Sequence, residues 1–191
     1  TPCGTLFPYT TLFRSLRAAG SEMENGIAYF SASRFSEALH TFRNIIADPD
    51  KDELHGDAYF WLAKTHLAMN NLNDCEKNLE FFLLNYEDNR YFPEALYQKG
   101  RLLYLQKEYE KAIQVLYNFI EQFPSNPFTG NAYFWIGESL YDLGHFDKAV
   151  KVFRTVVQEY PKSYKHDAAQ YRISLIELKY REQELMKFLK W

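Results

Sequence analysis

The sequence predicts an all-α protein, a solenoid of antiparallel helix pairs that repeat every 37 residues. Apolar residues recur at three- and four-residue steps on both sides of Gly144, which indicates two short helices joined by a tight turn. This pair spans 132–161, and Pro161 ends its second helix because proline cannot continue a helix. A pair this short cannot bury its apolar faces alone, so it must stack against copies of itself.

Three columns of equivalent positions, each at steps of 37 residues, define the repeat. The first column holds only small residues, namely Gly26, Ala63, Gly100 and Gly137. The second column is also small and consists of Ala38, Cys75, Ala112 and Ala149. The third column is large and apolar, with Phe42, Leu79, Leu116 and Phe153. Small residues are needed where two helices cross closely, and the large residues fill the space between successive pairs.

The sequence contains about four full repeats in succession, followed by a partial fifth. The first three span about 21–50, 56–86 and 93–124, and the fourth is the pair described above. The fifth begins at Ser163 but lacks a glycine turn, and its last residues predict a helix that is either a cap or the front of another repeat. Because terminal repeats normally carry a polar outer face, this apolar end indicates truncation.

The repeat resembles the tetratricopeptide repeat, a helix-turn-helix unit of about 34 residues. The matching residues of the fourth unit are Tyr133, Ile136, Gly137, Leu140, Ala149, Phe153 and Pro161. The extra length of each unit falls in the links, such as 123–132 and 160–169. The resemblance covers about 21–174 and implies a right-handed superhelix that acts as a non-enzymatic protein-interaction scaffold.

Links of the Tyr-Pro-x-Ser type resemble those of two bacterial envelope proteins. One is the repeat domain of the Tol–Pal cell-division coordinator, and the other is the lipoprotein subunit of the outer-membrane β-barrel assembly machine. This resemblance rests on the links only, and it implies a location in the bacterial cell envelope or periplasm. The alternatives are a cytoplasmic adaptor, the sensor arm of a larger signalling protein, or an enzyme whose catalytic domain lies outside this sequence.

Residues 1–15 stand outside the repeat pattern. Within them, Thr5–Ser15 resembles the in-frame translation of a common sequencing adapter, and an ordinary apolar leader is the alternative. The apolar run is too short, and too interrupted by Pro8 and Arg14, to span a membrane. We therefore expect a tetratricopeptide-like array over 16–191, about four full repeats and a partial fifth, with its natural ends missing on both sides.

Composition and motifs argue against several classes of function. The net charge is −3, from 22 basic and 25 acidic residues, which gives no electrostatic footprint for a nucleic acid. The sequence has no glycine-rich phosphate loop, Gly-x-Ser-x-Gly elbow or His-Glu-x-x-His motif. No histidine stands at metal-ligand spacing from another histidine or cysteine, and His66 and Cys75 occupy columns of core residues. We predict no enzymatic activity, no metal, no cofactor and no membrane insertion.

A binding surface is the remaining candidate, because the first helix of each pair lines a concave groove in the resembling family. One column on this face contains Met23, Phe60, Tyr97, Phe134 and Tyr171. A second column, one helical turn on, contains Phe30, Leu67, Tyr104, Tyr141 and Leu178. Between the two columns lie Ile27, Lys64, Arg101, Glu138 and Leu175. Co-chaperones of this family place lysine and asparagine on these faces to grip a carboxylate tail, and that clamp is missing here.

From these columns we predict a groove that binds a peptide or a partner helix. Its residues are Phe60, Lys64, Tyr97, Arg101, Tyr104, Phe134, Glu138, Tyr141 and Tyr171. The tyrosines favour a semi-exposed surface, since a buried phenol needs a hydrogen-bond partner. The alternative is that the first aromatic column packs between repeats, and the sequence leaves this choice open. The identity of the partner and the oligomeric state do not follow from the sequence.

Overall fold

The computed structural model describes residues 21–189, which form two compact units, one within Thr1–Phe92 and one within Pro93–Trp191. Over the described range all regular secondary structure is helical and no strand occurs, so the all-α prediction is confirmed. The adapter-like segment Thr5–Ser15 lies outside the described residues. Each unit is described by itself below.

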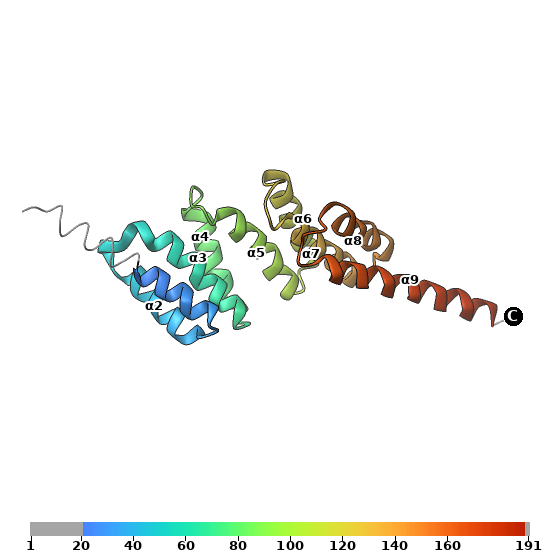
Figure 1. Cartoon of the computed structure of the whole chain (residues 1–191), viewed down its shortest axis with the longest axis horizontal. Helices are drawn as coiled ribbons and strands as arrows, with labels where there is room; N and C mark the ends of the chain where they lie inside the picture. The colour runs from blue at the N-terminus through green and yellow to red at the C-terminus, as the bar shows by residue number, and fades with distance from the viewer. Residues whose placement is uncertain (1–20, 190–191) are drawn as a thin grey trace, which may run out of the picture. The chain divides into compact units, whose positions relative to one another are not determined.

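The first unit contains two helix pairs. A helix over 21–31 is followed by α2 (Phe35–Ala47), and the 3₁₀-helix η1 (Pro49–Lys51) leads into α3 (Asp52–Ala68) and α4 (Leu72–Asn85). Consecutive helices are spatial neighbours, α2 against α3 and α3 against α4 (Figure 1). These two helix pairs lie at the positions expected for the first and second repeats.

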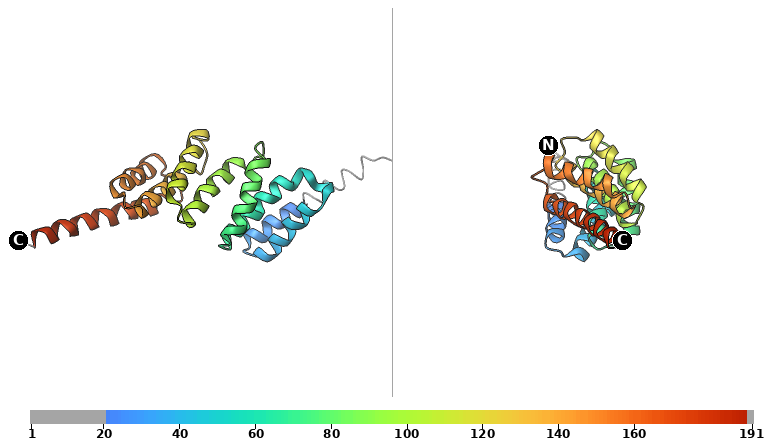
Figure 2. Two further views of the ribbon diagram at one scale, coloured as in Figure 1. Left: turned by 180° about the vertical axis from the view of Figure 1, so that it is seen from behind. Right: turned by 90° about the vertical axis from the view of Figure 1, so that its right-hand side faces the viewer.

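The second unit contains two further pairs and a long final helix. The pairs are α5 (Phe92–Leu105) with α6 (Tyr109–Gln122), and α7 (Thr129–Asp142) with α8 (Phe146–Glu159). The last helix, α9 (His166–Phe188), packs on α8, and its C-terminal half extends past the other helices of the unit (Figure 2). The fifth repeat is thus one continuous helix, in agreement with the missing glycine turn.

The small columns lie where the two helices of a pair cross. A Cβ atom placed on Gly137 would lie 2.5 Å from Cε1 of Phe153, which belongs to the large column of the same repeat. A Cβ on Gly26 would meet the ring of Phe42 at the same distance. Both phenylalanines are fully buried, so their rings have little room to move away. Glycine is therefore required by the close approach of the two helices.

The turn inside every pair uses one residue in the left-handed region of backbone space. These residues stand 37 positions apart and are Ser33, Asn70, Lys107 and Gly144, with φ angles of 59°, 59°, 64° and 79°. At the fourth turn the amide of His145 donates to the carbonyl of Leu140 at 2.8 Å, and the other turns repeat this bond. This is the Schellman arrangement, in which a left-handed residue lets the chain satisfy the last carbonyls of the helix.

The third turn gives the first testable prediction. Lys107→Gly should stabilise the protein by about 1 kcal/mol, because the left-handed conformation costs a residue with a Cβ atom about 1–2 kcal/mol. Asn70→Gly is the matched control, since asparagine tolerates this conformation and should gain much less. Urea denaturation of both variants checks the difference. An equal gain at the two turns, or a loss at position 107, would contradict the explanation.

Candidate protein-binding surface

The first aromatic column lies in the interior, which decides between the two alternatives for that column. Phe60 and Tyr97 are each 1% exposed and Phe134 is 5% exposed, whereas Tyr171 on the last helix is 63% exposed. The prediction that Phe60, Tyr97 and Phe134 line an open groove is therefore wrong as to their placement. They belong to the packing between successive repeats.

Residues from the links cover this column. In the first unit the ring of Tyr91 stacks on Phe60, with centroids 4.5 Å apart and planes 8° apart. In the second unit Phe128 stacks on Tyr97 in the same way, at 5.0 Å and 15°. The turn that brings each link ring into place is fixed by a side chain two residues earlier, as when Asn126 accepts a hydrogen bond from the amide of Phe128 at 2.9 Å. The aromatic column is buried because each link folds back over it.

Tyr97 is buried with its hydroxyl group satisfied. The indole N–H of Trp135 donates to the Tyr97 hydroxyl at 3.1 Å, and the hydroxyl of Tyr164 lies 3.2 Å away. Burial raises the pKa of Tyr97 well above its usual value, and the neighbouring Tyr164 adds to the effect. The expectation that a tyrosine here marks a semi-exposed surface is therefore wrong, since the required partner is supplied from within the unit.

Glu138 is also buried, and it forms an internal ion pair. Arg172 donates to both carboxylate oxygens, from Nε at 2.6 Å and from Nη2 at 2.5 Å. The hydrogen bonds to Glu138 raise the pKa of Arg172, and its guanidinium also lies 5.0 Å from the ring centroid of Tyr141. This two-pronged geometry fixes α9 against α7. Glu138 is predicted as a groove residue, but its carboxylate is occupied within the protein.

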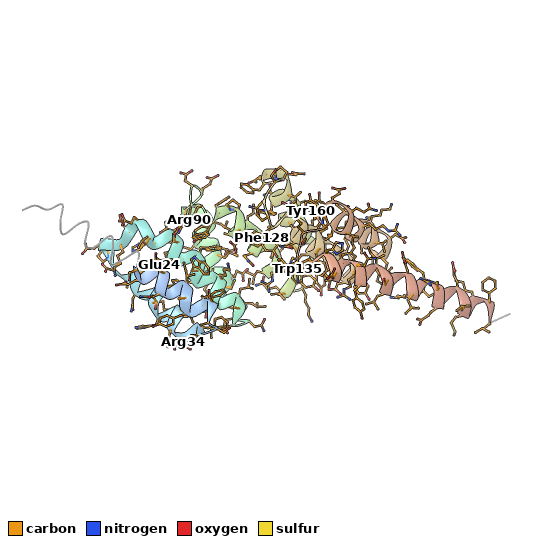
Figure 3. The ribbon with its side chains drawn as sticks, viewed as in Figure 1. Glu24, Arg34, Arg90, Phe128, Trp135 and Tyr160 are labelled. Atoms are coloured by element: carbon orange, nitrogen blue, oxygen red, sulfur yellow. The ribbon has the colours of Figure 1, made fainter. Side chains whose placement is uncertain are left out.

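Trp135 on α7 is partly exposed, and Figure 3 labels its side chain. The Arg101 guanidinium lies 5.7 Å from its ring centroid, and the Lys165 ammonium lies 4.9 Å away. The ring centroid of Tyr104 lies 4.9 Å from that of Trp135. Cations near an indole face are attracted by its quadrupole, so the two side chains are held beside the ring. We call Arg101, Tyr104, Trp135 and Lys165 the Trp135 cluster.

The predicted tyrosines of the second unit other than Tyr97 are at least partly exposed. Tyr104 and Tyr141 are half-buried, and Tyr141 packs its ring edge-on against Phe146 at 5.2 Å. Burial raises the pKa of Tyr104, and a hydrogen bond to Asp142 raises it further. Of the predicted residues in this unit, Arg101, Tyr104, Tyr141 and Tyr171 therefore reach the surface.

The first unit carries a related arrangement around Trp61. The ammonium of Lys64 lies 4.5 Å from the Trp61 ring centroid, 5.6 Å from that of Phe60 and 5.7 Å from that of Phe30. Trp61 occupies the same column as Trp135, two repeats earlier. Lys64, predicted as a groove residue, is thus partly buried against aromatic rings.

Sequence reasoning missed Trp61, Trp135 and Lys165. Both tryptophans stand in one 37-residue column, next to the phenylalanine column that was chosen. Lys165 lies in a link, where the equivalent positions hold Tyr91 and Phe128. If the 37-residue columns had been extended from the helices into the links, the repeat period alone would have paired these link residues with the first helices.

The described part of the chain holds no group of three histidine, cysteine or carboxylate side chains placed to bind a metal ion. Among residues 21–189, no helix has both the length and the apolar character needed to cross a bilayer. His66 is buried, and burial lowers the pKa of its imidazole, while Cys75 is a buried free thiol. Both residues occupy the core columns in which the sequence places them.

Stacked helix pairs with aromatic and charged side chains on one face define a helical-repeat protein of the class that presents surfaces to other proteins. The chain belongs to the tetratricopeptide repeat family. Family models for this repeat match residues 23–74, 94–126 and 131–163, together more than half of the chain. The predicted family and its helix-pair fold are confirmed.

Solved structures of tetratricopeptide repeat folds resemble the chain as well. MamA from AMB-1 is 22% identical, with 91% of this chain and 88% of MamA covered and a TM-score of 0.62. A further MamA crystal structure is 22% identical over 90% of this chain and 88% of MamA, with a TM-score of 0.66. PilF from Pseudomonas aeruginosa is 18% identical over 88% of this chain and 71% of PilF, with a TM-score of 0.72. These identities show the fold alone. No curated protein matches the chain.

Proposed function

We propose that this protein is a non-enzymatic scaffold that holds a partner segment, a peptide or a helix, on the first-helix face of its second unit. The observation that carries the proposal is the Trp135 cluster, where aromatic rings and two cations remain partly exposed. Large aromatic side chains provide contact area at a low cost in conformational entropy, and they dominate the binding energy of protein interfaces.

The second-helix face offers a useful contrast within the same unit. On α8 the exposed positions carry charged side chains such as Lys148, Lys151 and Arg154, spread along a solvated helix. Interfaces are depleted in lysine and enriched in tyrosine, tryptophan and arginine. Compared with α8, the face of α5, α7 and α9 therefore has the composition of an interface, and among the second helices α6 also exposes Tyr117.

The proposed setting is the bacterial cell envelope. It is supported by the Tyr-Pro-x-Ser link at 160–163, which resembles the links of two envelope proteins. A partner in this compartment would be another envelope protein or a segment of one. Recovery of the partner from the cytoplasmic fraction would favour a cytoplasmic adaptor instead.

Photo-crosslinking tests the proposed surface. A photoreactive phenylalanine analogue at position 171 should give a protein adduct in cells of the source organism, because Tyr171 is exposed on the proposed face. The same analogue at position 151, on the second-helix face, is the matched control and should give none. Mass spectrometry of the adduct identifies the partner, which we expect in the envelope fraction. Adducts of equal yield at both positions, or at neither, would contradict a binding face on the first helices.

A further inference from the structure

Two cations of the Trp135 cluster have no anionic partner within the described residues. The Nε atom of Arg101 is buried and makes no hydrogen bond. Lys165 lies with its ammonium 5.0 Å from the ring centroid of Phe134 and 5.2 Å from that of Tyr164, surrounded by aromatic rings. Burial lowers the pKa of Lys165, and repulsion from Arg101 lowers it further, against a smaller opposing effect of Glu138. Two like charges that repel each other therefore both lie beside the Trp135 ring, in a partly desolvated place.

The neighbouring carboxylates are already engaged. Glu138 binds Arg172 through both of its oxygens. Asp142, one turn further along α7, accepts hydrogen bonds from the hydroxyl groups of Tyr104 and Tyr109. Neither carboxylate is free to neutralise Arg101 and Lys165. An anion from outside the unit would therefore meet the unpaired Nε of Arg101 and the Lys165 ammonium that lies among aromatic rings.

We propose that Arg101 and Lys165 form a carboxylate-binding subsite that holds an aspartate or glutamate side chain of a partner segment beside Trp135. The inference rests on the proposed function and deepens it by naming the chemistry of the partner, an acidic segment with an apolar residue next to the acid. The apolar neighbour contacts the half-exposed rings of Trp135 and Tyr104. The rings supply contact area, and the paired cations select the acidic side chain.

A random peptide library displayed on phage, selected against the purified chain, is the probe. We expect the selected peptides to be enriched in aspartate or glutamate adjacent to an apolar residue. The best peptide is then synthesised with its acid and with the isosteric amide, and the Kd of each is measured by fluorescence anisotropy. R101Q/K165Q should weaken binding of the acidic peptide about tenfold or more, because charge-assisted hydrogen bonds are lost. The same variant should leave the weaker binding of the amide peptide unchanged.

K148Q/K151Q is the matched control, since it removes the same charge from exposed positions of α8. It should leave both Kd values unchanged, and an equal loss with this control would show non-specific charge attraction and overturn the subsite. Circular dichroism confirms that each variant is folded, and Lys165→Gln alone replaces the double variant if that variant unfolds. Lys165→Gln should then weaken binding of the acidic peptide but not of the amide peptide. Equal Kd values of the acidic peptide for the Lys165→Gln chain and the unaltered chain would overturn the subsite.

Three further outcomes separate the proposals. Selected peptides without an acidic preference would overturn the subsite, even if position 171 gives a crosslinked partner. Loss of binding when only the peptide C-terminus is amidated would place the carboxylate at a chain end and overturn the side-chain assignment. Failure of both the crosslink at position 171 and the peptide selection would overturn the proposed function itself.

Discussion

Tyr97→Ala is expected to destabilise the second unit by about 3–5 kcal/mol, the cost of removing a large aromatic ring from a core. The ring is 1% exposed and stacks on Phe128. Its loss leaves a cavity between α5 and Phe128 of the link that precedes α7, and it also leaves the indole N–H of Trp135 without its acceptor. Hydrogen exchange of α5 and α7, measured as a function of urea concentration, gives the local free energy of opening.

Tyr97→Phe is the matched control for this variant. It keeps the stacked ring but removes the hydroxyl shared with Trp135 and Tyr164, so it should cost only about 1 kcal/mol. A stability close to that of the unaltered protein for Tyr97→Ala would mean that the ring is not part of the core. Crosslinking at position 171 should continue in Tyr97→Phe, because the surface around Trp135 is retained.

Gly137→Val is expected to cost about 1–3 kcal/mol or more, because it inserts three carbon atoms into a close helix crossing. The first of these atoms alone would lie 2.5 Å from the ring of Phe153, and that ring is fully buried. The clash forces α7 away from α8, so amide protection should fall in those two helices. Because each repeat contacts only its neighbours, protection of α2 should be unchanged.

Gly137→Ala provides a graded control with one inserted carbon atom. It should be less destabilising than Gly137→Val and should affect the same two helices. A uniform loss of protection along the chain, α2 included, would contradict the nearest-neighbour character of the array. So would a valine variant as stable as the unaltered protein, which would place Gly137 away from a helix crossing.

The sequence by itself determined the helix pairs, their period and the columns that hold each pair together. These features follow from the chain's own periodicity, because helix faces repeat every few residues and a close crossing admits only a small side chain. The small residue at Gly137 could therefore be assigned to a close crossing before any coordinates. The sequence predicts Phe153 between successive pairs, whereas the structure packs it against Gly137 of its own pair. The turn at Gly144 was equally predictable, since glycine favours the left-handed conformation, whereas Lys107 in the same conformation gave no such signal.

Only the tertiary structure decided which aromatic residues are covered and which charges remain unsatisfied. The face of a first helix is apolar whether a link folds over it or a partner binds it, so periodicity cannot separate Tyr97 from a groove residue. The stacking of Phe128 on Tyr97 settles that point in the second unit. In the same way, Glu138 takes its partner from α9, and Arg101 and Lys165 are left together beside Trp135. The physical reason is that burial and charge pairing depend on contacts between segments more than thirty residues apart, which no local pattern records.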